Sequence, residues 1–321
     1  MPEGDTVHRV ARVLAAELTG QTLSEIKLHD RGEVPELAGC TIESVEAAGK
    51  HLLVDFSGDW TLRVHLGMHG RWLRKHVREP RPGGLLENDA SPQERDGYAP
   101  ETDAGSANSS AICATEDTPW RRPVRSGGRG FVLQQPPKDW TVIITTGEIA
   151  YVCRRSYRAE LVRTSALHAH PRLARLGPDL LADPPRIDDM VRRARLPGHA
   201  EREIGDVLLD QRVASGIGNV YKSEVLFEVR VHPRTKVREL SDAQLTRIFE
   251  TAAALMRPNL LTRRRTTVPL PRRGQPSSER LWVYGRAGKP CLECGTPIER
   301  FGQGDMARTT YFCPRCQASG A

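Results

Sequence analysis

Two pairs of cysteines near the end of the chain constrain its fold more than any other feature. Each pair is a Cys-x-x-Cys knuckle, and the four residues are Cys291, Cys294, Cys313 and Cys316. Four thiolates with this spacing bind a zinc ion in a closed tetrahedral site. A short tail with little apolar sequence is typically held together by such an ion. We therefore predict a zinc finger over 281–321, with one structural Zn²⁺ per chain as cofactor and no catalytic role for the metal.

The residues between the two knuckles predict a β-hairpin. The segment Arg308-Thr309-Thr310-Tyr311-Phe312 is rich in residues that favour strands. A hairpin built on this segment would carry Arg308 at its tip. A cation in that position suits the phosphate backbone of a nucleic acid duplex.

The composition is compatible with a nucleic acid partner. The formal net charge is +7 and the isoelectric point is about 9.2. Such a surplus favours a polyanion, although GC-rich coding also enriches arginine. No apolar run is long enough to span a membrane, and the N-terminus has no apolar signal-peptide core. We expect a soluble cytosolic protein in which Cys40, Cys113 and Cys153 are ordinary buried or loop thiols.

The chain begins Met1-Pro2-Glu3-Gly4-Asp5. Aminopeptidases remove a leading methionine when proline follows, which would leave Pro2 with a free secondary amine. An α-amino group titrates near pH ~8, so part of it is an uncharged nucleophile that can form a Schiff base. Glu3 is placed to donate or accept a proton beside it. An inert terminus is the alternative, because proline at position two is common.

Residues 1–165 predict a β-rich catalytic domain with one leading helix. Apolar residues recur at helical spacing after a cap at Asp5 or Thr6, at Val7, Val10, Ala11, Leu14 and Leu18. Alternating patterns from 22 to 73 predict antiparallel strands, with a hairpin formed by 51–56 and 60–66, and strands resume at 140–145 and 149–153. The sequence from about 75 to 138 is poor in apolar residues, and we predict a disordered surface insertion there.

Three places in this domain are candidates for binding or chemistry. Lys50 precedes a strand, where it would reach a phosphate or a reacting sugar, or would simply be a solvated strand end. Met68 lies in a glycine-flanked loop and would fill the gap left by an extruded base, or fold back onto its own sheet. Arg154 and Arg155 open a cluster with Tyr157 that would grip phosphate and stack a base, or form a solvated strand edge.

Residues 166–280 predict a helical domain. Helices are expected at 187–196, at 204–211 and from Asn219 onwards, and Ser241-Asp242-Ala243-Gln244 is a capping box for another. The sequence Gly216-Ile217-Gly218-Asn219 allows a tight turn that exposes the free N–H groups at the next helix start. Such a helix start is a ready phosphate site, although the same pattern is also typical of a simple corner.

Taken in order, these motifs resemble one family. Pro2-Glu3, Gly49-Lys50, Ile217-Gly218-Asn219 and the cysteine tail make the chain similar to the formamidopyrimidine-DNA glycosylase / endonuclease VIII family outside roughly 75–138. Gly4 looks more like the endonuclease VIII branch, and the segment from His65 to Met68 looks more like the other. The resemblance implies an α+β fold with an N-terminal β-sandwich and flanking helix, a helix–two-turn–helix domain and a zinc β-hairpin.

The resemblance also implies a bifunctional enzyme of base-excision repair, a DNA glycosylase with AP lyase activity. By similarity, the damaged base is flipped out, Pro2 attacks the sugar carbon, and Glu3 handles the proton transfers. Lys50 looks like the residue that assists β-elimination, and Arg308 matches the hairpin-tip arginine associated with δ-elimination and phosphate binding.

Further roles follow from the same resemblance. Asn219 matches a phosphate-binding residue and Met68 the void filler, while the Arg154-Arg155 cluster follows the family's Arg-Arg-Phe-Gly pattern loosely. We expect a monomer that binds damaged double-stranded DNA, with single-stranded or abasic DNA as further partners, and that associates with the nucleoid. Oxidised pyrimidines are the expected substrates. Oxidised purines, or non-catalytic binding of lesions or abasic sites, are the alternatives.

Overall fold

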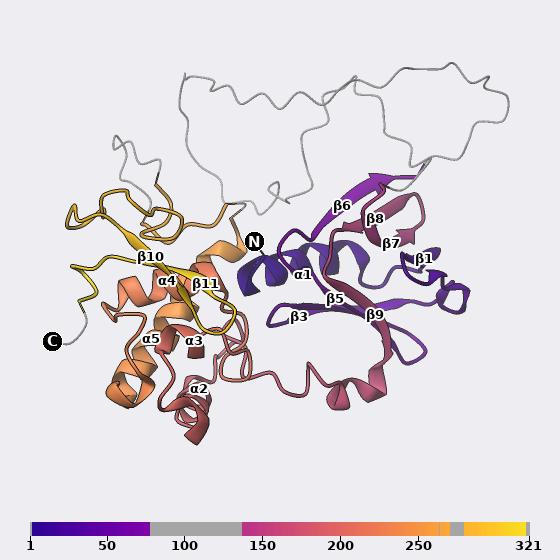
Figure 1. Ribbon diagram of the computed structural model, residues 1–321. Helices are drawn as coiled ribbons and strands as arrows, with labels where there is room; N and C mark the ends of the chain where they lie inside the picture. Colours follow the sequence, from indigo (N-terminus) through magenta and orange to yellow (C-terminus); the bar gives the residue numbers. More distant parts are fainter. Residues whose placement is uncertain (1, 78–136, 263, 270–278, 319–321) are drawn as a thin grey trace, which may run out of the picture.

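The computed structural model describes residues 2–77, 137–262, 264–269 and 279–318. Figure 1 shows two lobes, one built mainly of strands and the other of helices and the final hairpin. The insertion predicted from about 75 to 138 lies outside the described residues except at its edges, and so does Cys113. Strand β6 (Arg71–His76) continues past the predicted start of that insertion, because it pairs along its length with β8 (Ile149–Arg154).

The strands of the first lobe form two antiparallel sheets. One has the strand order β2-β1-β7-β8-β6. Its strands not yet introduced are β1 (Glu25–Leu28), β2 (Gly32–Glu33) and β7 (Trp140–Thr146). The other has the order β3-β4-β5-β9 and contains β3 (Ile42–Ala48), β4 (His51–Phe56), β5 (Trp60–His65) and β9 (Arg158–Arg163). The predicted hairpin is confirmed, since β4 pairs with β5 around a turn at Gly58 and Asp59, both with positive φ.

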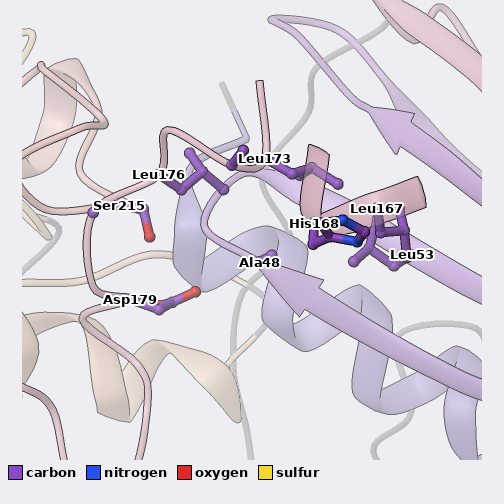
Figure 2. Close-up of a pocket in the computed structure, with 10 residues that line it drawn as sticks. Ala48, Leu53, Leu167, His168, Leu173, Leu176, Asp179 and Ser215 are labelled. Atoms are coloured by element: carbon purple, nitrogen blue, oxygen red, sulfur yellow. The ribbon is translucent and has the colours of Figure 1, made fainter. Parts of the chain in front are cut away.

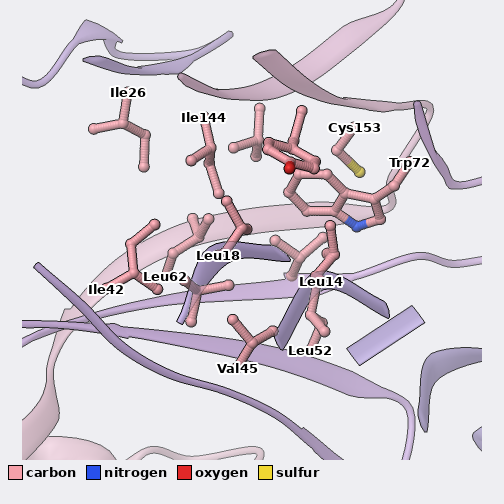
Figure 3. Close-up of a cluster of buried hydrophobic side chains, with 14 of the residues drawn as sticks. Leu14, Leu18, Ile26, Ile42, Val45, Leu52, Leu62, Trp72, Ile144 and Cys153 are labelled. Carbon is pink, nitrogen blue, oxygen red and sulfur yellow. The ribbon is translucent and has the colours of Figure 1, made fainter. Parts of the chain in front are cut away.

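The apolar core of this lobe lies between the two sheets. Figure 3 shows side chains of both sheets meeting Leu14 and Leu18 of α1 (Gly4–Leu18). Cys153 is buried there as an ordinary thiol, and burial raises its pKa to about 12. The predicted cap of α1 is wrong: the helix begins at Gly4 and no side chain caps it, because the carboxylates of Glu3 and Asp5 bind the other lobe.

The second lobe contains four α-helices among the described residues, namely α2 (Ile187–Ala194), α3 (Ile204–Val207), α4 (Asn219–Glu228) and α5 (Asp242–Met256). The capping box of α5 is confirmed by reciprocal hydrogen bonds between Ser241 and Gln244 of 3.2 and 2.8 Å. The helix predicted over 204–211 is wrong beyond Val207. There the Asp210 carboxylate accepts hydrogen bonds from the backbone and side chain of Arg212, which favours a turn over a further helical turn.

Short 3₁₀ helices connect these elements. They are η1 (Pro35–Leu37), η2 (Thr164–Ala169), η3 (Pro197–His199), η4 (Val237–Glu239) and η5 (Arg257–Leu260). No helix in the described part of the chain is both long and apolar enough to cross a bilayer.

The tail folds against the helical lobe. Strands β10 (Glu299–Gln303) and β11 (Arg308–Phe312) pair antiparallel, so the predicted hairpin is confirmed. Phe227 of α4 joins a small core with the buried cysteines of the tail. The buried Glu224 carboxylate accepts the backbone N–H groups of residues 282–284, which fastens the tail to α4. The described residues therefore have the expected α+β architecture.

Candidate active site

Glu3 lies where the two lobes meet. Its side chain is fully buried, and its carboxylate accepts backbone N–H groups from Gly218 (2.9 Å), Val220 (2.8 Å) and Tyr221 (3.3 Å). These amides form the N-terminus of α4, where the helix dipole favours a negative charge. The start of the chain is thereby fixed against the helical lobe, with Pro2 directly beside it.

Two glycines make this close approach possible. A Cβ atom on Gly218 would lie 2.3 Å from Glu3 Cδ, and one on Gly4 would lie 2.8 Å from Gly216 Cα. The Gly4 N–H also donates to the Gly216 carbonyl at 2.9 Å. The glycine-punctuated corner before α4 therefore leaves room for the first residues of the chain.

Lys50 directly precedes β4, in a turn that contacts the other lobe. The Gly49 N–H donates to Asp179 Oδ2 at 2.6 Å, and His8 Nε2 lies 2.9 Å from the same oxygen. Burial lowers the pKa of Lys50 to about 8; the charge of Glu3 opposes this shift and that of Arg308 reinforces it. Glu3, Lys50 and Arg308, from three distant segments, thus share one electrostatic environment.

A cavity of about 360 Å³ lies beside this turn. Figure 2 shows Asp179 and Ser215 at one side of it, and His168 beside Leu53 and Leu167 at the other. None of the predicted catalytic residues lines this cavity. The cavity is therefore not the predicted catalytic centre.

A buried ion pair behind Glu3 was not predicted from the sequence. Asp5 is 1% exposed, and its carboxylate accepts Arg265 Nε at 2.8 Å and the Tyr221 hydroxyl at 3.0 Å. Burial alone would lower the pKa of Arg265, but the hydrogen bonds to Asp5 raise it. Burial and the Asp5 charge both raise the pKa of Tyr221. This network holds α1, α4 and the segment after η5 together beneath the site.

Asn219 and Arg308 come together at the edge of the zinc hairpin. Asn219 Nδ2 donates to the carbonyl oxygen of Thr309 at 2.6 Å, so the start of α4 touches β11. Arg308 is exposed at the first position of β11, and its guanidinium forms no ion pair with a carboxylate of the described residues. Its charge is available to an external anion.

Met68 lies in a loop that neighbours the one with Arg155 and Tyr157, which follows Arg154 at the end of β8. Met68 is 62% exposed and Tyr157 is 69% exposed. A Cβ atom on Gly67 would lie 2.7 Å from Tyr157 Cβ, so the two loops are in contact. Arg154 and Arg155 are both held by the carboxylate of Asp139, at 2.5 and 2.6 Å. Tyr157 was part of the predicted cluster, and its contact with the Met68 loop singles it out as a surface ring beside the wedge candidate.

The four cysteines of the tail form one cluster. Their sulfur atoms all lie within 4.8 Å of one another, with Cys291 Sγ 3.9 Å from Cys316 Sγ and Cys294 Sγ 3.4 Å from Cys313 Sγ. In a tetrahedral site with Zn–S bonds of about 2.3 Å, the sulfurs lie roughly 3.8 Å apart. The donor set and its spacing therefore fit a structural zinc ion.

Replacing Cys313 by serine is expected to lower zinc content and loosen the hairpin. Cys313 is fully buried beside Phe227, so an unligated hydroxyl there would also be unfavourable. Zinc content is measured by atomic absorption, and DNA affinity by fluorescence anisotropy. Cys40→Ser, at a partly buried thiol outside the cluster, is the control. Unchanged zinc content in the Cys313 variant would contradict the ligand assignment.

Three family models match the chain. They are the formamidopyrimidine-DNA glycosylase N-terminal domain over residues 1–100, the H2TH domain of the same enzyme over 176–268, and a zinc finger found in FPG and IleRS over 288–318. They match in the order in which the strand-rich lobe, the helical lobe and the cysteine tail follow one another.

Curated relatives match over the full length. A probable endonuclease 8 2 from Streptomyces coelicolor is 34% identical, with 100% of this chain and 95% of the relative covered. The DNA-(apurinic or apyrimidinic site) lyase Nei2 of Mycolicibacterium smegmatis is 31% identical, with 99% and 100% covered. Coverage of 95% or more on both sides means that the similarity extends through both lobes and the tail.

A solved structure shows the same fold. The complex between Lactococcus lactis Fpg and an abasic site containing DNA has a TM-score of 0.69 with this chain, at 19% identity, covering 99% of this chain and 100% of that one. The family models and the relatives agree. The chain belongs to the formamidopyrimidine-DNA glycosylase / endonuclease VIII family of DNA glycosylases with AP lyase activity.

Proposed function

We propose that this enzyme excises oxidised bases, pyrimidines foremost, through a Schiff base on Pro2, followed by β,δ-elimination. The observation that carries the proposal is the docking of Glu3 on α4. It fixes the first residues at the junction of the lobes, where burial lowers the pKa of Lys50, the charge of Glu3 raises it and that of Arg308 lowers it. A terminus held this firmly is unusual for an inert chain end.

In the proposed reaction, Met1 has been removed and the Pro2 nitrogen attacks the anomeric carbon of the damaged nucleoside. The bond from that carbon to the base breaks, and the base leaves with a proton. Glu3 transfers protons as the sugar ring opens and the imine forms. Loss of a sugar proton then expels the 3′ phosphate by β-elimination, assisted by Lys50. Loss of a second proton expels the 5′ phosphate by δ-elimination, assisted by Arg308.

The same residues would hold damaged duplex DNA. Lys50, Asn219 and Arg308 contact phosphates from three segments, and Arg154 and Arg155 add charge beside the Met68 loop. Met68, an exposed apolar side chain on a loop, fills the gap left by the flipped base. Zinc supplies structural support by holding the hairpin that carries Arg308. Binding at several phosphates should weaken steeply with salt.

The proposed preference for pyrimidine lesions rests on the resemblance of Gly4 to the endonuclease VIII branch, and several relatives carry the name endonuclease 8. The His65–Met68 segment, which resembles the formamidopyrimidine branch, supports oxidised purines as a second substrate class. Abasic DNA and single-stranded DNA are proposed as further partners, and association with the nucleoid would follow from DNA binding.

Borohydride trapping on defined duplexes tests the proposal. Borohydride reduces an imine to a stable amine, so a Schiff base appears as a covalent protein–DNA band. We expect adducts with an oxidised pyrimidine and with an abasic site, slower trapping with an oxidised purine, and none with undamaged DNA. Absence of an adduct on every lesion, with Met1-free protein of full zinc content, would exclude the mechanism. Faster trapping on the purine would reverse the assigned preference.

A further inference from the structure

Lys222 is a fully buried residue of α4, and the proposed reaction does not use its charge. Its ammonium finds no hydrogen-bond partner among the described residues. The buried Oδ1 of Asn219, one turn earlier, is likewise an acceptor without a donor in that part of the chain. Leaving a buried charge and a buried carbonyl unpaired is unfavourable for the fold. Such groups are retained where they take part in binding or catalysis.

Lys222 faces the zinc hairpin. Residues three and four positions apart share one face of a helix, so Asn219, Lys222 and Ser223 lie together. Asn219 donates to the carbonyl of Thr309 in β11 at 2.6 Å, and Ser223 Oγ accepts the N–H of Tyr311 at 3.2 Å. Lys222 therefore lies against the strand that begins with Arg308.

The charges around Lys222 agree with this placement. Its pKa is lowered to about 8, first by burial and second by the positive charge of Arg308 on β11. Asp206 of α3 and Glu3 act in the opposite direction. Near neutral pH the ammonium remains mostly protonated, so a hydrogen-bond donor is present beside Arg308.

The hydrogen bond of Asn219 conflicts with its proposed role. Asn219 Nδ2 is engaged by Thr309 in this structure, whereas phosphate binding needs that amide to donate to DNA. If the amide turned, its Oδ1 would require a donor in a buried place. Lys222 offers an unused donor on the same helix face.

We propose that Lys222 is a positioning residue for the phosphate contact. When DNA docks, its ammonium donates to Asn219 Oδ1 and directs Asn219 Nδ2 from the Thr309 carbonyl to a phosphate oxygen beside Arg308. Its buried charge also attracts that phosphate without touching it. The inference rests on the proposed function. It assigns to α4 a hydrogen bond between Lys222 and Asn219 that forms only when DNA is bound.

A double-mutant cycle of Lys222→Met and Asn219→Ala tests this role. The ligand is a duplex with a tetrahydrofuran abasic analogue, and Kd is measured over a series of salt concentrations. We expect Lys222→Met to weaken binding about tenfold or more, the loss typical of one charge-assisted hydrogen bond. Adding Asn219→Ala to it should weaken binding little further, because the amide is already misdirected. Lys27→Met, at a partly exposed lysine on β1, is the control.

Thermal unfolding separates this role from a structural one. Removing an unpaired buried charge should leave Tm unchanged or raise it at pH 7, although DNA binding is weakened. Because the folded pKa, about 8, lies below the ordinary value of 10.5, the Tm gain is full below pH 8 and shrinks as pH rises towards 10.5. A purely structural lysine would lower Tm and leave Kd unaltered.

Two results would overturn the proposal: wild-type affinity in Lys222→Met, or a full Asn219→Ala effect in that background. Should Lys222→Met fail to fold, Lys222→Leu, which also lacks a donor, is measured in the same cycle with the same expectations. Wild-type trapping tests the proposed function by itself. If the wild-type enzyme forms the trapped adduct and binds DNA, but the effects of Lys222→Met and Asn219→Ala on Kd are additive, this inference is rejected. The proposed function is then unaffected.

Discussion

An enzyme with one extra residue in front of Pro2 is expected to lose the trapped adduct by a factor on the order of 10³ or more. The extension turns the Pro2 nitrogen into an amide, whose lone pair is delocalised and does not attack the sugar carbon. It also moves the free amine by roughly 3.8 Å, which misplaces it for in-line attack. Single-turnover trapping on abasic DNA measures the loss.

The extension should leave the rest of the site intact. Glu3 is held on α4 through its own side chain, and Asp5 keeps its contact with Arg265. Affinity for the abasic analogue and zinc content are therefore expected to stay near wild type. The matched control is a protein with one residue added after Ala321. Trapping at the wild-type rate by the N-terminally extended enzyme would assign the nucleophile to another amine, with Lys50 the first candidate.

The second large effect is expected for Glu3→Gln. Base excision should fall by about 10²–10⁴-fold, the usual contribution of a positioned acid or base. Stability should fall as well, because the new NH₂ group would face the N–H of Val220 or those of Gly218 and Tyr221. Leaving a buried donor unsatisfied costs about 1–3 kcal/mol.

Excision kinetics and thermal unfolding together separate the two contributions of Glu3. Glu17→Gln is the matched control, since Glu17 lies on the same helix but accepts from Arg74 and Tyr151 away from α4. The control should lose stability without losing excision. Pre-formed abasic DNA should be processed with a smaller loss than a damaged base. Wild-type excision by the folded Glu3 variant would contradict the proton-transfer role.

Much of the fold could be predicted because its signals are local. Alternation marked the hairpin of β4 and β5, the capping box marked the start of α5, and the knuckle spacing marked the metal cluster. Helix ends were less predictable. The cap of α1 and the length of α3 depend on bonds made by Glu3, Asp5 and Asp210, which helical periodicity does not register.

The candidate site divides in the same way. Short sequence motifs identified Pro2, Glu3, Lys50 and Asn219 as candidate site residues. Their chemical roles are proposals. The Asp5–Arg265–Tyr221 network joins residues more than 200 positions apart, and no local pattern marks such partners. Lys222 reads as an ordinary helix lysine until its burial against β11 is known. Long-range pairing of polar groups is the part that requires the folded molecule.

The anchoring of residues 3–5 has a consequence for biosynthesis. Glu3 and Asp5 leave the ribosome first, yet the amides and the guanidinium that receive them belong to residues 218–221 and 265. A chain truncated before residue 218 would therefore carry the proposed nucleophile at Pro2 but would lack the backbone amides and the guanidinium that hold Glu3 and Asp5. We expect such a fragment to lack lyase activity.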